Sequence, residues 1–465
     1  MSKVINPEIF RESDIRGIVQ TDLLPDYVES IGKAIGTLLK RAGGRMITLG
    51  HDVRPSSKLI RNNLMSGLLS TGCHIIDIGT VPTPVSYYSQ HLFDSDGGVM
   101  ITGSHNPSEF NGFKISIGKN SIYGEKILEL YRMIVNKDFD TGRGIIEVQD
   151  ISEFYIQEIC KRIHIPKSIR TVVDGGNGCF GLIGPRLFKR MGIEPFELYC
   201  EPDGTFPNHH PDPTTRKNLA ELRKKVLIEN ADVGVGFDGD VDRIGVVDDN
   251  GDIIWGDYLL ILFARYILSK SPGATIVGEV KCSQNLFQDI RSRGGIPVMT
   301  SAGHSLIKKK MRDTGALLAG EMSGHIFFAD DYYGYDDAIY AACRLFQILA
   351  QSDMKLSELL TDLPKTYYTP EIRIDCPDNQ KFRIVEEVAG YFKSRFEVLE
   401  VDGARINFED GWAIVRASNT QPVLVLRFEA QTAQRLNEYQ ELLFQRLEQY
   451  DCIEIDQITA QINEA

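Results

Sequence analysis

Short apolar runs that end in polar, glycine-bearing turns recur through the first three quarters of this chain. Residues 46–49, 99–101 and 233–237 are three such runs. Between them lie segments such as residues 27–39, which carry apolar side chains at helical spacing and end at a basic turn and two glycines. This alternation predicts βαβ units on a largely parallel sheet, in which ligand-facing loops leave the carboxyl ends of the strands.

The same plan of strand and polar turn repeats in two further blocks, for example at residues 170–173 and at residues 274–280. Identity between the blocks is weak, so the repetition is one of architecture. We predict three similar mixed α/β domains in series around a central cleft, at residues 1–150, 151–250 and 251–364.

The pattern changes from about residue 365 onward. Residues 366–374 alternate like a single antiparallel strand, and residues 412–416 and 423–428 flank a polar turn as in a hairpin. A helical pattern then runs from residue 433 toward residue 449. These elements predict a smaller α+β C-terminal domain at residues 365–465.

Composition restricts the partners of this chain. It has 465 residues, 42% hydrophobic and 25% charged, which is ordinary for a globular protein with several cores. The net charge of -13 argues against general nucleic-acid binding, because phosphate backbones attract basic surfaces. An anionic substrate must therefore be bound by local basic groups or by a metal ion.

Cysteine usage and hydropathy indicate a cytoplasmic protein. The eight cysteines are scattered singly, without the spacing of a disulfide framework or of a zinc site. The N-terminal residues form no apolar signal segment, and the apolar runs are too short to span a bilayer. We expect reduced thiols and no membrane partner.

The turn after residues 99–101 contains Gly103, Ser104 and Pro107, and Lys114 follows shortly after it. Gly103 permits backbone angles closed to other residues, and Pro107 biases the residue before it toward an extended conformation. Ser104 is therefore well placed to face a ligand, with Lys114 near enough to donate or accept a proton. An ordinary polar turn after a core strand is the alternative.

The aspartates at 238, 240 and 242 are the most specific chemical signal. Three carboxylates this close require a cation, and Mg²⁺ prefers oxygen ligands. An EF-hand is excluded, because Arg243 stands where that loop needs glycine and a strand precedes the cluster. A solvated acidic turn is the other alternative. Mg²⁺ held by carboxylates leaves room for a substrate phosphate, which points to phosphoryl transfer.

Two further turns carry candidate binding groups. Residues 416–422 combine a guanidinium, two hydroxyls and an amide, which can surround a phosphate or satisfy their own backbone. Residues 320–325 present a carboxylate and a hydroxyl suited to sugar hydroxyls. The charged residues 11–17 and the lysines at 308–310 are typical of solvated surface. No phosphate-binding loop of nucleotide triphosphatases and no hydrolase nucleophile elbow is present.

Together these stretches resemble the α-D-phosphohexomutase family nearly end to end. Residues 102–107 resemble its phosphoserine loop, 238–243 its metal loop, 320–325 its sugar-binding loop and 416–420 its phosphate-binding loop, in family order. With methionine at position 322, the sugar-binding loop resembles that of the bacterial phosphomannomutase/phosphoglucomutase branch of the family.

The resemblance implies that a phosphorylated Ser104 transfers its phosphoryl group to a hexose monophosphate. The resulting hexose 1,6-bisphosphate, which is also the activator, turns around and returns its other phosphate to Ser104. One Mg²⁺ per chain would be held by Ser104, Asp238, Asp240 and Asp242. Lys114 would be the general acid/base.

The same resemblance implies roles for the remaining site residues. Charge around the transferring group would be stabilised by Arg16, His105, Arg243 and His304. Glu321 and Ser323 would bind the sugar O3 and O4. The substrate and its non-reacting phosphate would also contact Lys281, Arg416, Ser418, Asn419 and Thr420.

Glucose and mannose differ only at C2, so a site that holds O3, O4 and a phosphate predicts activity on both sugars. We expect a monomer with a mobile last domain. Phosphoglucosamine mutase is the closest alternative. A metal-dependent sugar phosphatase and a non-catalytic sugar-phosphate sensor are the others.

Overall fold

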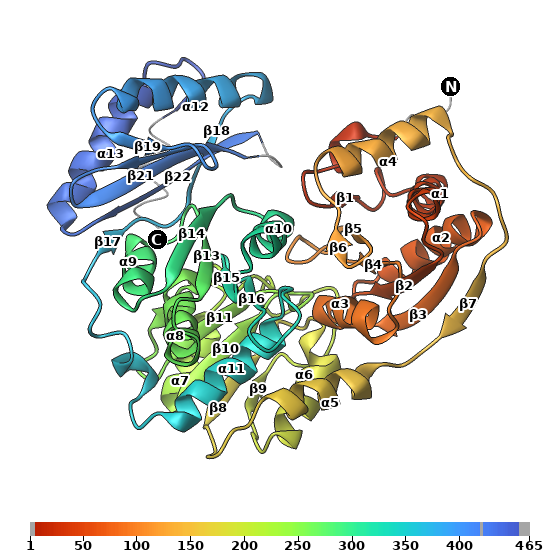
Figure 1. Cartoon of the computed structure of the whole chain (residues 1–465), viewed down its shortest axis with the longest axis horizontal. Helices are drawn as coiled ribbons and strands as arrows, with labels where there is room; N and C mark the ends of the chain where they lie inside the picture. Colours follow the sequence, from red (N-terminus) through yellow and green to blue (C-terminus); the bar gives the residue numbers. More distant parts are fainter. Residues whose placement is uncertain (1–4, 419–421, 455–465) are drawn as a thin grey trace.

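The computed structural model describes residues 5–418 and 422–454, which form four successive units, each built on its own sheet (Figure 1). Within these residues, no helix is both long and apolar enough to cross a membrane. The predicted fold class is confirmed: three mixed α/β domains precede a smaller α+β domain.

Domain I contains a seven-stranded sheet with strand order β1-β5-β4-β2-β3-β7, and β6 pairs with β5. Strands β4, β2, β3 and β7 are parallel, whereas β1, β5 and β6 are antiparallel to their neighbours. The prediction of a largely parallel sheet is therefore wrong at this edge, because β4 and β5 form a direct antiparallel pair. The elements are β1 (Ile15–Ile18), α1 (Pro25–Arg41), β2 (Met46–His51), α2 (Ser57–Ser70), β3 (His74–Thr80), α3 (Thr83–Leu92), β4 (Gly97–Ile101), β5 (Phe110–Ile117), β6 (Asn120–Ser121), α4 (Glu125–Asn136) and β7 (Ile145–Val148).

Domain II has a five-stranded sheet in the order β12-β11-β10-β8-β9. Strand β10 runs parallel to β8 and antiparallel to β11, so the turn between β10 and β11 projects from the carboxyl end of a central strand. That turn is the aspartate cluster. The elements are α5 (Ser152–Arg162), β8 (Thr171–Asp174), α6 (Phe180–Arg190), β9 (Phe196–Leu198), α7 (Ala220–Glu229), β10 (Val233–Phe237), β11 (Ile244–Asp248) and β12 (Ile253–Ile254).

Domain III repeats the plan on a four-stranded sheet in the order β14-β13-β15-β16. The antiparallel pair β15 and β16 places residues 321–325 in the turn between them. The elements are α8 (Gly256–Lys270), β13 (Thr275–Glu279), α9 (Gln284–Ser292), β14 (Ile296–Thr300), α10 (His304–Thr314), β15 (Leu318–Gly320), β16 (Ile326–Phe328) and α11 (Ala338–Gln351).

Domain IV packs two helices on a six-stranded antiparallel sheet. The expected single strand over residues 366–374 is instead two short strands, β17 (Tyr367–Tyr368) and β18 (Ile372–Asp375), both paired with β22. Pro370 lies between them and has no N–H for the ladder. The other elements are α12 (Asp378–Lys393), β19 (Glu397–Leu399), β20 (Ala404–Asn407), β21 (Gly411–Ala417), β22 (Val423–Ala430) and α13 (Ala433–Leu447).

The apolar cores divide the chain differently from the sheets. One continuous core joins α3 of domain I to α5 and α6 of domain II and to α8 and α11 of domain III. Domain I also has a core of its own, between its sheet and α1, α2 and α4. Domain IV has a separate core, and in Figure 1 it lies across from domain I, beside β13, β14 and α9.

Candidate active site

Ser104 lies in the loop that leaves β4, only 3% exposed, with a left-handed backbone at φ 50°. Gly103 permits unusual backbone angles but does not adopt a positive φ here; Ser104 itself has the left-handed backbone. Gly103 is required for another reason. A Cβ there would lie 2.6 Å from Cζ of the buried Arg54.

The Ser104 side chain faces domain II. Its hydroxyl donates to Asp238 Oδ2 at 3.0 Å, and its Oγ lies 3.2 Å from His105 Nδ1. Arg16 reaches the same loop and donates to Asn106 Oδ1 at 2.7 Å. The expectation that residues 11–17 form a purely solvated charge run is therefore wrong for Arg16, whose side chain is 18% exposed.

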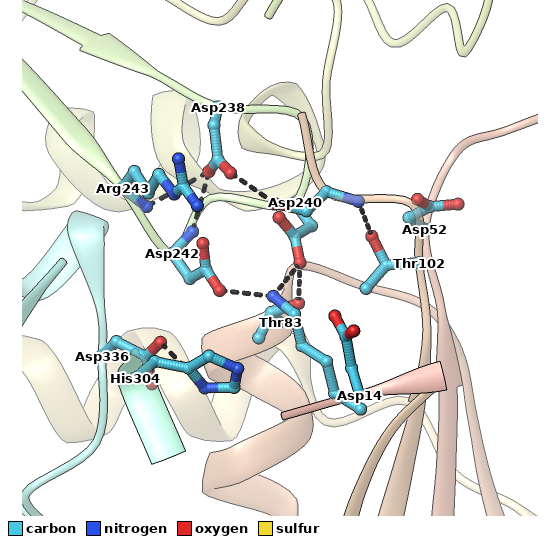
Figure 2. Close-up of polar contacts among 12 residues, drawn as sticks. Asp14, Asp52, Thr83, Thr102, Asp238, Asp240, Asp242, Arg243, His304 and Asp336 are labelled. Carbon is cyan, nitrogen blue, oxygen red and sulfur yellow. Dashed lines mark hydrogen bonds and ion pairs between the residues drawn. The ribbon is translucent and has the colours of Figure 1, made fainter. Parts of the chain in front are cut away.

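The three aspartates after β10 are fully buried, and one ligand oxygen from each lies within 4.8 Å of the others (Figure 2). Val241 holds the loop in a sharp turn with φ 70°, a conformation that β-branched residues rarely adopt. Asp238 Oδ1 accepts from the backbone N–H groups of Asp242 and Arg243 at 3.0 and 3.1 Å. The backbone therefore aims alternate carboxylates at one point.

This carboxylate cluster fits a hard cation. Burial, followed by repulsion from Asp240 and Asp242, holds the pKa of Asp238 well above its usual value. Among the described residues, Oδ1 of Asp240 and Oδ1 of Asp242 are buried without a hydrogen-bond partner. Unpaired carboxylate oxygens are costly to bury, and an oxygen-binding metal ion would satisfy them.

Lys114, on β5, points at the aspartates. Its Nζ lies 2.6 Å from Asp240 Oδ2 and also forms an ion pair with Asp242. Burial by itself would lower the pKa of Lys114, but the two carboxylates hold it well above its usual value. Thr83, at the start of α3, donates to the same Asp240 oxygen. Lys114 and the aspartates thus form one buried network. The role of Lys114 as general acid/base stays a prediction.

A second polar cluster from domain III adjoins the aspartates. Asp336 Oδ2 lies 3.1 Å from His325 Nδ1 and 3.8 Å from His304 Nδ1, and Figure 2 shows His304 beside Asp336. His325 Nε2 accepts from Arg243 Nε at 3.0 Å. Burial, with a smaller effect of Lys308, holds the pKa of His304 well below its usual value, which favours the neutral ring.

Sequence reasoning gave His325 and Asp336 no role. His325 lies within the predicted sugar-binding loop, where a histidine between polar residues is a local signal for a functional side chain. Asp336 lies in no motif. Lys308 was expected on a solvated helix face, which is wrong. It is buried, with its Nζ 3.1 Å from Asp336 Oδ1, while Lys309 does face solvent.

The predicted sugar loop is preformed. Ser323 Oγ donates to Glu321 Oε2 at 2.6 Å, and Glu321 Oε1 accepts from the backbone N–H of Gly303 at 2.5 Å. Burial would raise the pKa of Glu321, but His325, Ser323 and Lys281 hold it below its usual value. A charged carboxylate is therefore available to accept from sugar hydroxyls.

The predicted phosphate-binding groups and Lys281, predicted to bind substrate, lie at the junction of domains III and IV. Lys281 Nζ lies 2.7 Å from Glu371 Oε2, and Arg416 Nε donates to Asp402 Oδ2 at 3.1 Å. Asp402 also accepts from the backbone N–H of Ala302 at 3.1 Å. Ser418 is buried in the same turn, whereas Asn419 and Thr420 lie outside the described residues.

Four family models match the chain consecutively. Their descriptions are phosphoglucomutase/phosphomannomutase alpha/beta/alpha domain I over residues 7–140, domain II over 153–251, domain III over 255–367 and the C-terminal domain over 371–446. These ranges contain, in order, the Ser104 loop, the aspartate loop, the Glu321 loop and the Arg416 turn.

Curated relatives match over almost the whole chain. A phosphomannomutase/phosphoglucomutase of Pseudomonas aeruginosa is 44% identical over 95% of this chain and 96% of its own length. A phosphoglucomutase of Neisseria gonorrhoeae is 41% identical over 92% and 94%. A crystal structure of a phosphoglucomutase/phosphomannomutase family protein from Burkholderia thailandensis superposes with a TM-score of 0.91 and 41% identity, covering 96% and 98% of the two chains.

Proposed function

Because this chain belongs to the phosphoglucomutase/phosphomannomutase family, we propose that it interconverts the 1-phosphates and 6-phosphates of glucose and mannose. The phosphoryl group would be carried by Ser104 and exchanged through a hexose 1,6-bisphosphate. The observation that carries this proposal is the 3.0 Å contact between the Ser104 hydroxyl and Asp238, one of three buried carboxylates on the neighbouring domain.

One Mg²⁺ would be held by Asp238, Asp240 and Asp242 together with an oxygen at Ser104. Carboxylate and phosphate oxygens suit this cation, and the unpaired Oδ1 atoms of Asp240 and Asp242 support the fit. When bound, the ion supplies neutralisation of the charge that gathers on a transferring phosphoryl group. The bisphosphate would also be the activator that primes Ser104.

The chain's own residues supply position and charge, which phosphoryl transfer needs most. In the transfer to sugar, the bond from Ser104 Oγ to phosphorus breaks and the bond from the sugar oxygen to phosphorus forms. The sugar hydroxyl loses a proton and Ser104 Oγ gains one, with Lys114 as the proposed acid/base. Arg16, His105, Arg243 and His304 would stabilise charge around the group in transit.

The far end of the substrate would be held by domains III and IV. Glu321 and Ser323 would bind the sugar O3 and O4, and the non-reacting phosphate would be held by Arg416, Ser418, Asn419 and Thr420. Lys281 would also contact the substrate. Neither set would contact C2, so glucose and mannose would both react. Hydrolysis does not require a bisphosphate to be retained, so a set of residues that holds the non-reacting phosphate argues against a phosphatase. The relatives are named phosphomannomutase/phosphoglucomutase and phosphoglucomutase, which does not favour phosphoglucosamine mutase.

We further propose a cytoplasmic monomer that acts on small hexose phosphates. All eight cysteines are free, and six of them are buried, as expected in a reducing compartment. A last domain with its own core would move relative to the other three, which admits substrate and lets the bisphosphate turn around.

Intact-protein mass spectrometry after incubation with glucose 1,6-bisphosphate tests the proposal. We expect the wild-type chain to gain one phosphoryl group and the Ser104→Ala variant to gain none. An unmodified wild type, or an adduct that persists in Ser104→Ala, would overturn the assignment of Ser104. Steady release of inorganic phosphate from the bisphosphate would favour the phosphatase instead.

A further inference from the structure

Arg54 lies in the loop that leaves β2, and its side chain is completely buried. A guanidinium group has five N–H donors in a rigid plane. In Arg54 each has an acceptor: Nε donates to Asp52 Oδ2 (3.1 Å), Nη1 to the carbonyls of Pro107 (2.6 Å) and Phe110 (3.0 Å), and Nη2 to those of Ser104 (2.8 Å) and Asn106 (2.6 Å). Three of these five acceptors belong to the loop that carries Ser104, and the fourth, Phe110, begins β5, the strand that follows this loop.

The loop needs such support because its backbone is strained. A left-handed conformation is unfavourable for serine and persists only where its surroundings enforce it. Thr102 Oγ1 accepts from the Ser104 N–H at 2.8 Å, and Asn106 donates through its N–H to the Gly103 carbonyl at 2.9 Å. Arg54 donates hydrogen bonds to the backbone carbonyl groups that point toward it from this turn.

The guanidinium is fixed from both sides. On the loop side, Gly103 lies so close that a Cβ would be 2.6 Å from Cζ. On the other side, domain II closes over it: the Phe206 ring centroid is 5.1 Å from Cζ, and a Cβ on Gly204 would lie 2.5 Å from the Arg54 Cα. Asp52 anchors it within domain I and also accepts from Ser57.

We propose that Arg54 is a positioning residue that holds the Ser104 loop in the geometry that brings Ser104 Oγ to Asp238. The proposal rests on the proposed function of Ser104 as the phosphate carrier. Arg54 lies behind the loop and binds its carbonyls, so it acts on the reaction through Ser104. Lysine cannot replace it, because an ammonium has three donors and no planar fork.

Two variants test this in different ways. Arg54→Lys keeps the charge and removes the fork, and Gly103→Ala keeps Arg54 but displaces its guanidinium. We expect each to slow the phosphorylation of Ser104 by glucose 1,6-bisphosphate about a hundredfold, the effect of a small misplacement of a reacting group. The kcat with glucose 1-phosphate should fall alongside, while KM changes less than about threefold, because the binding groups of domains III and IV are untouched.

Arg344→Lys is the matched control. Arg344 is also buried, pairs with Asp330, and lies in α11 far along the chain from the loop. It should lower the unfolding temperature as Arg54→Lys does, yet leave the phosphorylation rate near that of the wild type. If Arg54→Lys does not fold, Gly103→Ala decides.

The outcomes separate the two proposals. A wild-type chain that accepts no phosphoryl group overturns the proposed function of Ser104. A phosphorylated wild type with unchanged rates in Gly103→Ala and Arg54→Lys overturns the role of Arg54. If Arg344→Lys slowed the phosphorylation of Ser104 as much as Arg54→Lys does, the loss of rate would reflect general destabilisation. That result would also overturn the proposed role of Arg54.

Discussion

The two junctions that carry the candidate site differ in how they are built. Domains I, II and III share one apolar core, and the Ser104 loop, the aspartates and the histidines meet beside it, nearly all buried. At the junction of domains III and IV, the apolar cluster among the described residues consists of Val280, Trp412 and Ile414. Met299 packs against this cluster, and hydrogen bonds and ion pairs also cross the junction.

Two buried arginines of domain IV bind groups of domain III at this junction. Arg405 donates to the carbonyls of Val280 and Cys282 and lies 3.8 Å over the Trp412 ring, while Arg427 pairs with Asp257 at 3.2 Å. Hydrogen bonds and ion pairs exchange with water at smaller net cost than a shared apolar core. We infer that the reacting end of the site is held rigid and that the binding end depends on the placement of domain IV.

Loss of a carboxylate at the reacting end should give the largest effect. We expect Asp242→Asn to lower kcat at least about a thousandfold, roughly 4 kcal/mol, because the buried cluster loses a ligand oxygen with full charge. The kinetics are measured over a range of Mg²⁺ concentrations, with the exposed Asp252→Asn as control. Near-normal turnover in Asp242→Asn would contradict the assignment of the metal site.

Loss of the ion pair between Lys281 and Glu371 should have the largest effect on the stability of the junction between domains III and IV. Glu371→Gln leaves a buried cation unpaired, so we expect a stability loss of about 3 kcal/mol, seen in thermal unfolding and in proteolytic release of domain IV. The exposed Glu400→Gln should cost less than about 1 kcal/mol.

The same pair predicts a pH dependence. Burial would raise the pKa of Glu371, but Lys281 and Arg373 hold it far below its usual value. A depressed carboxyl pKa stabilises the fold above the ordinary value near 4.5 and loses that contribution as pH falls below it. Wild type should therefore lose stability in acid more steeply than Glu371→Gln, as measured by unfolding from pH 6 down to about pH 3; parallel curves would refute the pairing.

Replacement of Arg416, the predicted phosphate-binding arginine, should have a smaller effect, which we expect on substrate binding and turnover. Arg416→Ala is expected to lower kcat/KM about thirtyfold, from a charged hydrogen-bond contribution of roughly 2 kcal/mol. Arg435→Ala, on the exposed face of the same domain, is the control. An unaltered kcat/KM in Arg416→Ala would remove this residue from the binding end.

The smallest difference should be that between the two sugars. Because the predicted contacts do not include C2, kcat/KM for glucose 1-phosphate and mannose 1-phosphate should agree within about tenfold, roughly 1.4 kcal/mol. Parallel assays with glucosamine 1-phosphate address the alternative. A preference between glucose and mannose above about a thousandfold would show that a group near C2 has been overlooked.

Much of the site could be predicted because its chemistry lies in short continuous segments. The aspartates alternate within one turn, and Ser104 directly follows a buried strand, so local sequence contains both signals. Arg54, Lys308 and Asp336 could not be found in this way. Each is an ordinary charged residue until a distant segment, such as the Ser104 loop for Arg54, lies against it.

The sequence alone determined the four-part plan, the aspartate loop and the position of Ser104, because periodicity and turn chemistry are local properties. Only the tertiary structure decided that Ser104, and not Gly103, adopts the left-handed backbone, and that Lys114 faces Asp240 across a domain boundary. It also decided which lysines are buried. Burial and charge pairing depend on contacts between residues far apart in the chain, and pattern along the chain does not contain them.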